Sequence, residues 1–491
     1  MAPAGCFFAR PTAPPRSRIG PQATRPLRDL PGPRGWPLVG NLPQIRPASI
    51  HHDVERWAAS FGSLYRLRFG RKNVLVIADH ELATAVLRDR PEGFRRNPLG
   101  ARIGRQMGLP EGMINAEGEE WRKQRRMVMA SFAPGNIRSY FPALVRVALR
   151  LRGRLQRAAR ERRAIPLQAD LMRFTVDVIA GLAFGSDVNT LESGEDTIQA
   201  HLDKVLPVLY RRMLSIVPSW RWFKLPADRA VDRSVAAINA TIREYVAEGR
   251  QRLRYDPSRV AAPQNLLEAM LVAADEPDSG LDDAHVIGNV LNMLLAGEET
   301  TANTLAWMID LLVRNPAARQ RAEQEVRSIA PDLAAFTFDQ MERLHYLESC
   351  VHETMRLKPV IPILTLQAID DTVVGDVAIP RETTILVALR PASVSGRSFE
   401  RPEAFAPERW LEDAEQPLTP AARRVSLPFG AGPRVCPGRY LAILEMKGAM
   451  AMLLASFDIE SVDTPDGGPA RELMAFSLQP VGQSLRLRDR G

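Results

Sequence analysis

The feature of this 491-residue sequence that most constrains its fold is a glycine-rich loop with one cysteine, directly before a predicted helix over residues 439–456. The loop contains Phe429, Gly430, Gly432, Arg434, Cys436, Pro437 and Gly438. Its glycines permit tight turns and leave room for a flat ligand, and a proline is favourable where a helix starts. Because a helix N-terminus favours an anion, the pattern predicts a thiolate at Cys436, with Arg434 adding positive charge. A purely structural cysteine would explain one or two of these glycines, but not the whole set.

Cysteine usage and composition indicate a packed globular protein of a reducing compartment. Three cysteines, at positions 6, 350 and 436, are too few for a disulfide framework, so we expect a cytoplasmic protein. A hydrophobic fraction of 45% with 25% charged residues is ordinary for a folded chain. The net charge is +8, but no dense basic run with interleaved aromatic residues appears, so nucleic-acid binding is not expected. A basic patch for one protein partner stays open.

The first 30 residues are rich in proline, alanine and arginine. Repeated prolines would break the amphipathic helix that a mitochondrial transit peptide must form, and no apolar run near the start is long enough for a membrane anchor. We expect a disordered tail over 1–30 and a single domain over 31–491. The protein is predicted to be a monomer without a transmembrane anchor.

Hydrophobic spacing predicts a mostly α-helical protein with small β-sheets, that is, an α+β fold. Helical spacing runs from His80 to Leu253, interrupted by a Gly- and Pro-rich stretch, Pro91–Glu117, that is typical of a long functional loop. The predicted strands span 63–69, 73–78, 363–368, 373–379 and 384–389. Another hairpin is expected in about the last thirty residues.

The longest apolar helix is predicted over 285–313, with Glu298 and Glu299 in its middle. Such a profile is typical of a helix buried within a large protein rather than of a membrane span. Two acids in a core are costly unless they have a partner or a task.

Two residue pairs share a helix face by their spacing. Glu353 and Arg356 are three residues apart, and Trp121 and Arg125 are four apart. Each pair alone is a weak signal, because such pairs occur on many exposed helices and contribute little energy there.

Together, these motifs resemble the cytochrome P-450 family, in the family's order and from about Pro31 to the end of the chain. The resemblance implies the P-450 fold, with the long buried helix above a haem b whose iron is held by Cys436. The residues that it assigns to haem binding are Cys436, Arg434, Trp121, Arg125, Phe429, Gly430, Gly438, Ala296 and Gly297. Among them, Trp121, Arg125 and Arg434 would donate to a haem propionate.

The segment 296–301 resembles the oxygen-activation motif of the family. The resemblance implies that Ala296 and Gly297 leave space for O₂, that Thr300 hydrogen-bonds the oxygen, and that Glu299 relays protons for O–O cleavage. Thr300 and Glu299 are therefore the expected catalytic residues.

A structural cluster is also implied by the resemblance. Arg409, in a Pro-Glu-Arg-Trp segment, would join Glu353 and Arg356 in the core behind the cysteine loop. The sequence departs from the family at Gln367, where many relatives have an arginine or histidine for a propionate. It departs again at 393–395, where a His-Arg-Asp stretch is common.

The implied activity is that of an EC 1.14-class monooxygenase, which inserts one atom of O₂ into an apolar small molecule by hydroxylation or epoxidation. Substrate contacts are expected from 91–117, 206–225, 291–300, 360–364 and 476–478. Met213–Leu225, with two tryptophans, is expected to pack against the core rather than touch a membrane. Only 55 residues follow Cys436 (491 − 436), so we expect electrons from a separate ferredoxin or flavodoxin-type donor. The predicted docking residues for this acidic partner are Arg122, Lys123 and Arg126.

Three other functions stay open at this point. A peroxide-driven peroxygenase or an isomerase would share the cysteine loop but would not need Glu299 and Thr300. A non-catalytic haem sensor or electron carrier would have no pocket for an organic ligand. A cysteine hydrolase built on Cys436 and His352 would leave the other motifs without a role.

Overall fold

The computed structural model describes residues 25–185, 188–192, 198–215, 218–412 and 418–490. The α-helices are α1 (Ile50–Phe61), α2 (His80–Arg88), α3 (Pro98–Gln106), α4 (Gly118–Ser131), α5 (Pro134–Arg160), α6 (Leu167–Phe184), α7 (Ile198–Leu214), α8 (Pro226–Tyr255), α9 (Ser258–Ala261), α10 (Leu266–Ala274), α11 (Asp283–Arg314), α12 (Pro316–Ile329), α13 (Phe338–Glu342), α14 (His345–Leu357), α15 (Arg390–Ser393), α16 (Pro420–Val425) and α17 (Arg439–Ser456). The strands are β1 (Arg25–Pro26), β2 (Leu64–Phe69), β3 (Lys72–Ile77), β4 (Phe94–Arg96), β5 (Ile165–Pro166), β6 (Ile363–Ala368), β7 (Thr372–Val374), β8 (Val377–Ile379), β9 (Thr384–Ala388), β10 (Phe457–Asp463), β11 (Glu472–Met474), β12 (Leu478–Pro480) and β13 (Ser484–Asp489). The helix-rich fold with small sheets confirms the predicted class.

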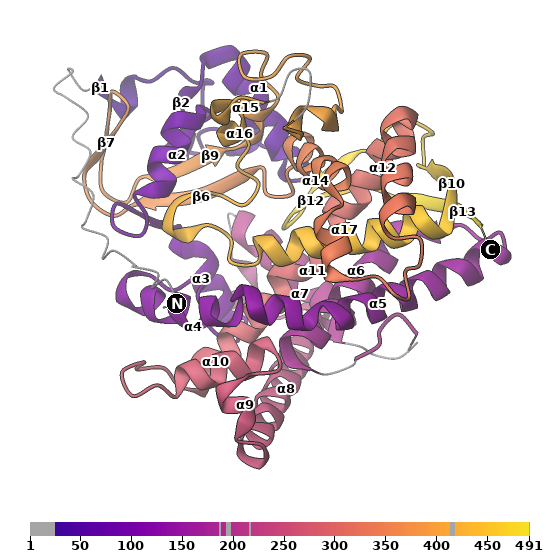
Figure 1. Cartoon of the computed structure of the whole chain (residues 1–491). Helices are drawn as coiled ribbons and strands as arrows, with labels where there is room; N and C mark the ends of the chain where they lie inside the picture. The colour runs from indigo at the N-terminus through magenta and orange to yellow at the C-terminus, as the bar shows by residue number, and fades with distance from the viewer. Residues whose placement is uncertain (1–24, 186–187, 193–197, 216–217, 413–417, 491) are drawn as a thin grey trace, which may run out of the picture.

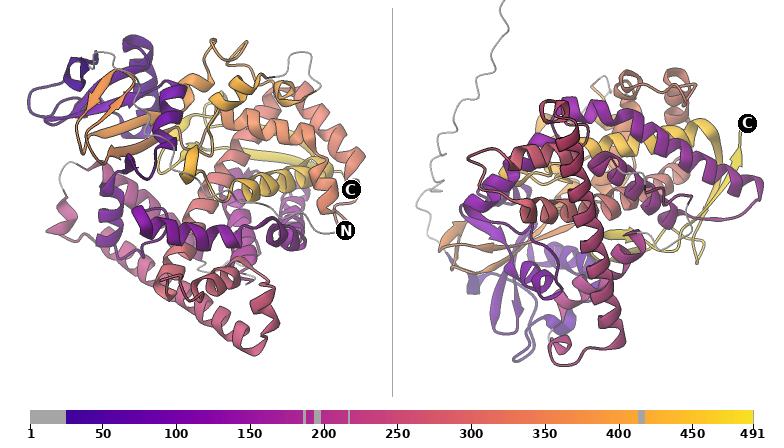
Figure 2. Two further views of the ribbon diagram at one scale, coloured as in Figure 1. Left: turned by 60° about the vertical axis from the view of Figure 1, so that its left-hand side comes forward. Right: turned by 90° about the horizontal axis from the view of Figure 1, so that it is seen from below.

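The largest sheet has the strand order β2-β3-β9-β6-β4 and joins segments from both halves of the chain. Its side chains alternate between two apolar clusters, because successive residues of a strand point to opposite faces. Leu75 and Ile77 of β3 pack with residues of α2, and Val74 and Val76 pack with residues of α1. The indigo and orange strands of this sheet gather on one side of the molecule, and most helices lie on the other (Figures 1 and 2).

The helix α11 runs through the helical part of the molecule and contacts α6, α8, α10, α14 and α17. Asp282 caps its N-terminus by accepting from the backbone N–H of His285. Most of its side chains are buried, as predicted for the segment 285–313. No helix in the described part of the chain is long and apolar enough to cross a membrane.

The stretch Pro91–Glu117, predicted as a loop, contains both β4 and α3. The side chain of Asn97 caps α3 by accepting from the N–H of Leu99, and Pro98 follows at the first helical position. Both residues are ordinary helix-start signals, and the surrounding glycines obscured them.

The chain is ordered before the expected end of the tail at residue 30. Strand β1 pairs in parallel with β8, and Leu27 and Leu30 are buried against the main sheet. Residues 1–24 lie outside the described part, so the division into a tail and one domain stays a prediction. In Met213–Leu225, Met213 packs against the core as expected, whereas Trp222 and Phe223 are 65% and 74% exposed, which corrects the expectation for that end of the segment.

Candidate active site

The cysteine loop folds back on itself immediately before α17. The backbone N–H of Cys436 donates to the carbonyl of Phe429 at 3.0 Å, which closes the loop. Gly430 and Gly432 adopt φ values of 72° and 71°, a region that favours glycine. A Cβ at Gly432 would lie 2.6 Å from the carbonyl oxygen of Leu87, so this glycine lets the loop pack on α2.

The two loop glycines assigned to haem binding, Gly430 and Gly438, differ in their surroundings. A Cβ built on Gly430 meets no atom within 4 Å, so the loop surface beside it can accept a flat ligand. Gly438 has an ordinary φ of −83°, so the conformational freedom expected there is not required.

Opposing effects act on the thiol of Cys436. Burial raises its pKa, and this effect outweighs the Gly438 N–H and the charges of Arg125 and Arg439, which lower it. The thiolate expected at Cys436 stays a prediction. Arg434, expected to favour the anion, binds Glu117 and the carbonyl of Ala116 instead.

A group of buried cations lies beside the loop. The guanidinium of Arg434 stacks 4.6 Å from the ring centroid of Trp121 and leaves its buried Nε without a partner among the described residues. Arg90, 4% exposed, has both Nε and Nη2 without partners in the same part of the chain. Burial, together with Arg96 and Arg434, lowers the pKa of Arg90 to about 9. Since Glu117, with a smaller contribution from Glu92, offsets these charges, the group suits an additional anion.

The remaining predicted anchor, Arg125, lies one turn after Trp121 on α4 and is half-buried. Its charge acts on Cys436, and burial is the main cause of its lowered pKa. Sequence analysis missed Arg90 and also Arg95, whose Nε and Nη2 donate to Oε1 of Gln367 at 3.0 and 2.8 Å. Strand β4 thus places the guanidinium of Arg95 beside Gln367, the position where the sequence departs from the family.

On α11, the small residues and Thr300 have distinct surroundings. The hydroxyl of Thr300 donates to the carbonyl of Ala296 at 2.6 Å, within the helix. Ala296 is exposed and Thr300 is partly exposed, in the middle of a largely buried helix. A Cβ at Gly297 would lie 2.4 Å from Cδ1 of Ile179 on α6, so Gly297 permits close packing of these two helices. The space for O₂ expected at this glycine stays a prediction.

Glu298 and Glu299, in the middle of α11, are both buried. Burial and the charge of Asp203 raise the pKa of Glu299, the hydroxyl of Ser477 lowers it, and together they bring it to about 7. Burial, with Asp203 and Glu299, raises the pKa of Glu298 well above its ordinary value. Glu299 is therefore the acid poised to exchange a proton near neutral pH.

The cluster expected behind the loop is confirmed. Glu353 and Arg356 are fully buried and form two hydrogen bonds of 2.8 Å each. Arg409, from the 3-10 helix Pro407–Trp410, donates to Oε1 of Glu353 at 3.0 Å, and Trp410 donates to Oε2 at 2.8 Å. This cluster joins α14 to the segment that leads to the cysteine loop.

The segments predicted to contact substrate adjoin one another at several points. A Cβ at Gly112 would lie 2.2 Å from Nδ2 of Asn292 on α11. A Cβ at Gly100 would lie 3.6 Å from Met213, and the N–H of Leu478 donates to the carbonyl of Val360 at 2.7 Å.

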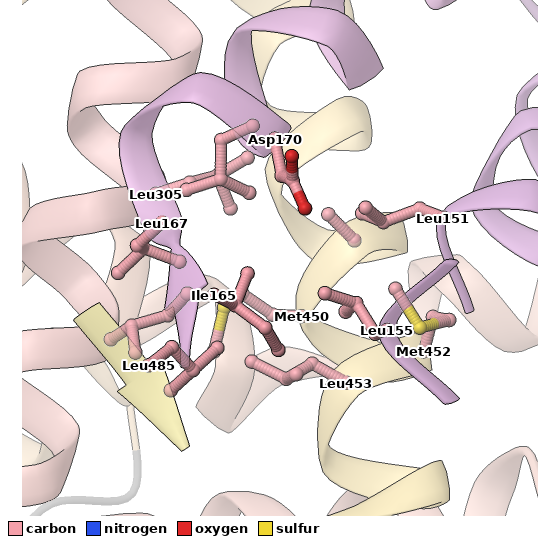
Figure 3. Close-up of a pocket in the computed structure, with 13 residues that line it drawn as sticks. Leu151, Leu155, Ile165, Leu167, Asp170, Leu305, Met450, Met452, Leu453 and Leu485 are labelled. Carbon is pink, nitrogen blue, oxygen red and sulfur yellow. The ribbon is translucent and has the colours of Figure 1, made fainter. Parts of the chain in front are cut away.

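An apolar cavity elsewhere lies between α5, α6, α11 and α17 (Figure 3), and no predicted site residue lines it. Its one acid, Asp170, is paired with Arg154 and Arg173. We therefore treat this cavity as a feature of core packing.

A comparison with protein-family models agrees with this geometry: residues 30–487 match the model described as cytochrome P-450. The chain belongs to the cytochrome P-450 family. Protein LUTEIN DEFICIENT 5, chloroplastic, of Arabidopsis thaliana is 27% identical over 86% of this chain and 71% of the relative. Carotene epsilon-monooxygenase, chloroplastic, of the same plant is 27% identical over 83% and 76%. Human steroid 17-alpha-hydroxylase/17,20 lyase is 25% identical over 90% and 89%.

As a cytochrome P-450, the chain is an oxidoreductase that uses haem b, O₂, an organic substrate and a redox partner. The structure fits this cofactor in two ways. Haem b carries propionate carboxylates, which suit the unpartnered guanidinium nitrogens of Arg90 and Arg434. The thiol of Cys436 and the open surface at Gly430 lie in the same loop.

Proposed function

We propose that this cytochrome P-450 inserts one atom of O₂ into an apolar small molecule, with the sulfur of Cys436 as the axial ligand of the haem iron. Metal coordination deprotonates a thiol, which would overcome the burial that raises the pKa of Cys436. The bound haem supplies O₂ activation and oxygen insertion. The observation that carries the proposal is the presence of this cysteine loop beside Arg90 and Arg434, whose buried guanidinium nitrogens include three without a partner among the described residues.

We assign the propionates to Arg434, Arg125, Trp121 and Arg90. Arg90 and Arg434 offer buried N–H groups, and charge-assisted hydrogen bonds to carboxylates are the strong kind. Arg95, oriented by Gln367, is the candidate replacement for the cation that the sequence lacks at position 367.

Glu299 and Thr300 would handle protons beside the reacting centre. A pKa of about 7 lets the Glu299 carboxyl give and regain a proton near neutral pH. The partly exposed hydroxyl of Thr300, next in sequence, would pass the proton on. Ala296 would keep the space beside them small and apolar.

For the substrate we favour isoprenoid molecules. The printed names of two relatives refer to carotene and steroid substrates, both extended apolar isoprenoids. Hydroxylation and epoxidation are both compatible with these names. The exposed apolar side chains Trp222 and Phe223 lie within the predicted substrate segment 206–225.

Electrons would come from a separate acidic protein of the ferredoxin or flavodoxin type. Of the three predicted docking residues, Arg126 is exposed, whereas Lys123 is half-buried and Arg122 pairs with Glu92 and Glu119. Arg126 is therefore the strongest candidate for docking.

A reduced-plus-CO difference spectrum tests the axial ligand. The wild-type protein should give the red-shifted Soret band of thiolate-ligated haem, and Cys436→His should give the shorter-wavelength band. A short-wavelength band from well-folded wild-type protein would overturn the assignment. Carotenoids, steroids and fatty acids should then be compared for the substrate-induced Soret shift, with the fatty acids as the contrasting class.

A further inference from the structure

One amide side chain of α11 binds two other elements of the chain. The side chain belongs to Asn289, which is 1% exposed. Its Oδ1 accepts from the backbone N–H of Met113 at 2.9 Å, and its Nδ2 donates to Oε1 of Gln124 on α4 at 2.8 Å. The same Nδ2 donates to the carbonyl of His285, one turn earlier in α11, at 2.8 Å. Asn289 therefore joins α11 to α4 and to the segment that contains Met113.

The partners of this amide determine its orientation. A backbone N–H can only donate and a backbone carbonyl can only accept. The contacts with Met113 and His285 therefore assign the oxygen and the nitrogen of the Asn289 amide. Nε2 of Gln124 donates to Oε1 of Glu120 at 2.7 Å, which leaves Oε1 of Gln124 to accept from Asn289. Because the group is buried, water does not compete for these bonds.

The segment around Met113 lies directly on the backbone of α11. A Cβ built on Gly288 would lie 1.8 Å from the carbonyl oxygen of Glu111. A Cβ built on Gly112 would lie 2.5 Å from the carbonyl oxygen of Gly288. Glycine at both positions permits this close backbone approach. The hydrogen bond to Met113 thus holds a segment that is already packed against the helix.

The same segment leads to Arg434 in the cysteine loop. The N–H of Ala116 donates to the carbonyl of Gly112 at 3.2 Å, so residues 112–116 form a turn. The carbonyl of Ala116 accepts from Nη2 of Arg434 at 2.7 Å. Helix α4 supplies a second support, because its Trp121 stacks against this guanidinium. The two elements that Asn289 joins to α11 are therefore the turn and the helix that contact Arg434.

We propose that Asn289 is a positioning residue for haem binding, which acts through these two elements on the guanidinium of Arg434. Nη2 of Arg434 is held by the carbonyl of Ala116. Its buried Nε has no partner among the described residues and is the donor left for a haem propionate. A guanidinium that is already oriented loses less freedom when it binds. This inference rests on the propionate role proposed above for Arg434.

The first test is the rate at which the holoenzyme releases haem to excess apomyoglobin. Asn289→Ala should release haem about tenfold faster than the wild type, because the hydrogen bond from Arg434 to a charged propionate is weakened. Asn303→Ala is the matched control, since Asn303 is also a buried amide of α11 but bonds to Gln168 and Ser477. The control should release haem at nearly the wild-type rate. A wild-type rate in Asn289→Ala, or an equal acceleration in both variants, overturns the proposal.

A double-mutant cycle separates the positioning of Arg434 from a general loosening of the fold. Arg434→Lys keeps the positive charge but lacks the planar set of donors that Asn289 is proposed to orient. In the Arg434→Lys background, Asn289→Ala should change the release rate by less than about twofold, since its effect passes through the guanidinium. The same acceleration in both backgrounds would show that Asn289 does not act through Arg434.

The CO band and the reduction potential of the holoenzyme distinguish this inference from the proposed function. Asn289→Ala should keep the CO band of the wild type, because the sulfur ligand is unchanged. Its reduction potential should fall, since a less well neutralised propionate disfavours the added electron, whereas Asn303→Ala should leave the potential unchanged. A wild-type protein without the thiolate band would overturn the proposed function. A wild-type release rate and potential in Asn289→Ala, with the band present, would overturn only the role of Asn289.

Discussion

Glu445 lies in the middle of α17, 2% exposed, and its carboxyl contacts the hydroxyl of Thr301 on α11. Burial raises its pKa to about 8, and the contact with Thr301 lowers it. Between its ordinary value and about 8, the folded protein binds a proton that the unfolded chain has lost. The free energy of unfolding should therefore decrease as pH rises through this window. By the linkage relation the loss is on the order of 4 kcal/mol.

We predict that Glu445→Gln removes most of this loss. The amide is neutral at every pH and has nearly the shape of the protonated acid, so the variant should match the wild type near pH 5 and exceed its stability above pH 8. Urea denaturation across this pH range measures both differences. If the stability of Glu445→Gln changed with pH in the same way as that of the wild type, this would contradict a buried, protonated Glu445.

Glu348 serves as a control, because its pKa is shifted in the opposite direction to that of Glu445. A hydrogen bond to His352 and the charge of Lys447 outweigh burial and lower its pKa to about 2. Its contribution to stability is present above the ordinary value and decreases as pH falls below it. Glu348→Gln should therefore destabilise the protein at neutral pH, with a difference that shrinks in acid.

At the scale of elements, the packing of α11 on α6 depends on Gly297. An alanine there would gain about 1 kcal/mol of helix propensity, but its Cβ would overlap Cδ1 of Ile179. Overpacking of a core costs about 1–3 kcal/mol, so we predict that Gly297→Ala is net destabilising. Ile179→Val removes the overlapping methyl group, and the double variant should recover stability relative to Gly297→Ala. A double-mutant cycle by chemical denaturation measures this coupling, and additive effects would contradict it.

Elements with strong local signals could be predicted from the sequence. The helix at 439–456 and the strands 363–368 and 384–389 agree with α17, β6 and β9 within one residue. Helix α3 was missed because glycines surround a cap that is otherwise ordinary. Elements whose local sequence signals agree can be predicted from hydrophobic spacing, whereas elements with conflicting signals are missed.

Contacts between distant segments could not be predicted in the same way. The cluster of Glu353, Arg356 and Arg409 was expected only because the motifs resemble those of a family. Arg90 carries no local pattern, because only the fold reveals that its buried Nε and Nη2 have no partner among the described residues. The packing role of Gly297 against Ile179 likewise appears only in three dimensions.

Across the whole molecule, Glu472 of β11 connects the two ends of the described chain. Its carboxylate binds Arg390 on α15 at 2.9 Å, His51 on α1 at 2.9 Å and His52 at 3.1 Å, and it also binds Lys358. Among the described residues, only His51, His52 and Glu472 form a cluster of possible metal ligands. The adjoining Arg390 and Lys358 already supply positive charge, so we interpret the cluster as an ion-pair network.

This network makes a prediction about acid stability. His51, Arg390 and Lys358 hold the pKa of Glu472 well below its ordinary value, although burial opposes them. A group with a depressed pKa in the folded state contributes stability above its ordinary pKa and loses it as pH falls below that value. Glu472→Gln removes the acid that Arg390 and Lys358 share, although Arg390 keeps Glu55, so we expect a loss of about 3 kcal/mol at neutral pH, the low end for a broken buried ion pair. Acid protonates and neutralises the wild-type carboxylate as well. The difference in stability between the wild type and Glu472→Gln should therefore narrow below about pH 4.

Asp466→Asn is the matched control for that substitution. Asp466 lies between β10 and β11 and bonds mainly within its own exposed turn, to Gly468 and Thr464. Surface changes of this kind usually alter stability by less than about 0.5 kcal/mol. Denaturation of both variants between pH 3 and 7 tests the prediction. If Glu472 has a purely local role, the stability of Glu472→Gln should vary with pH as that of Asp466→Asn does. A large neutral-pH loss confined to Glu472→Gln would instead show that the contacts of Glu472 with α1 and α15 stabilise the fold.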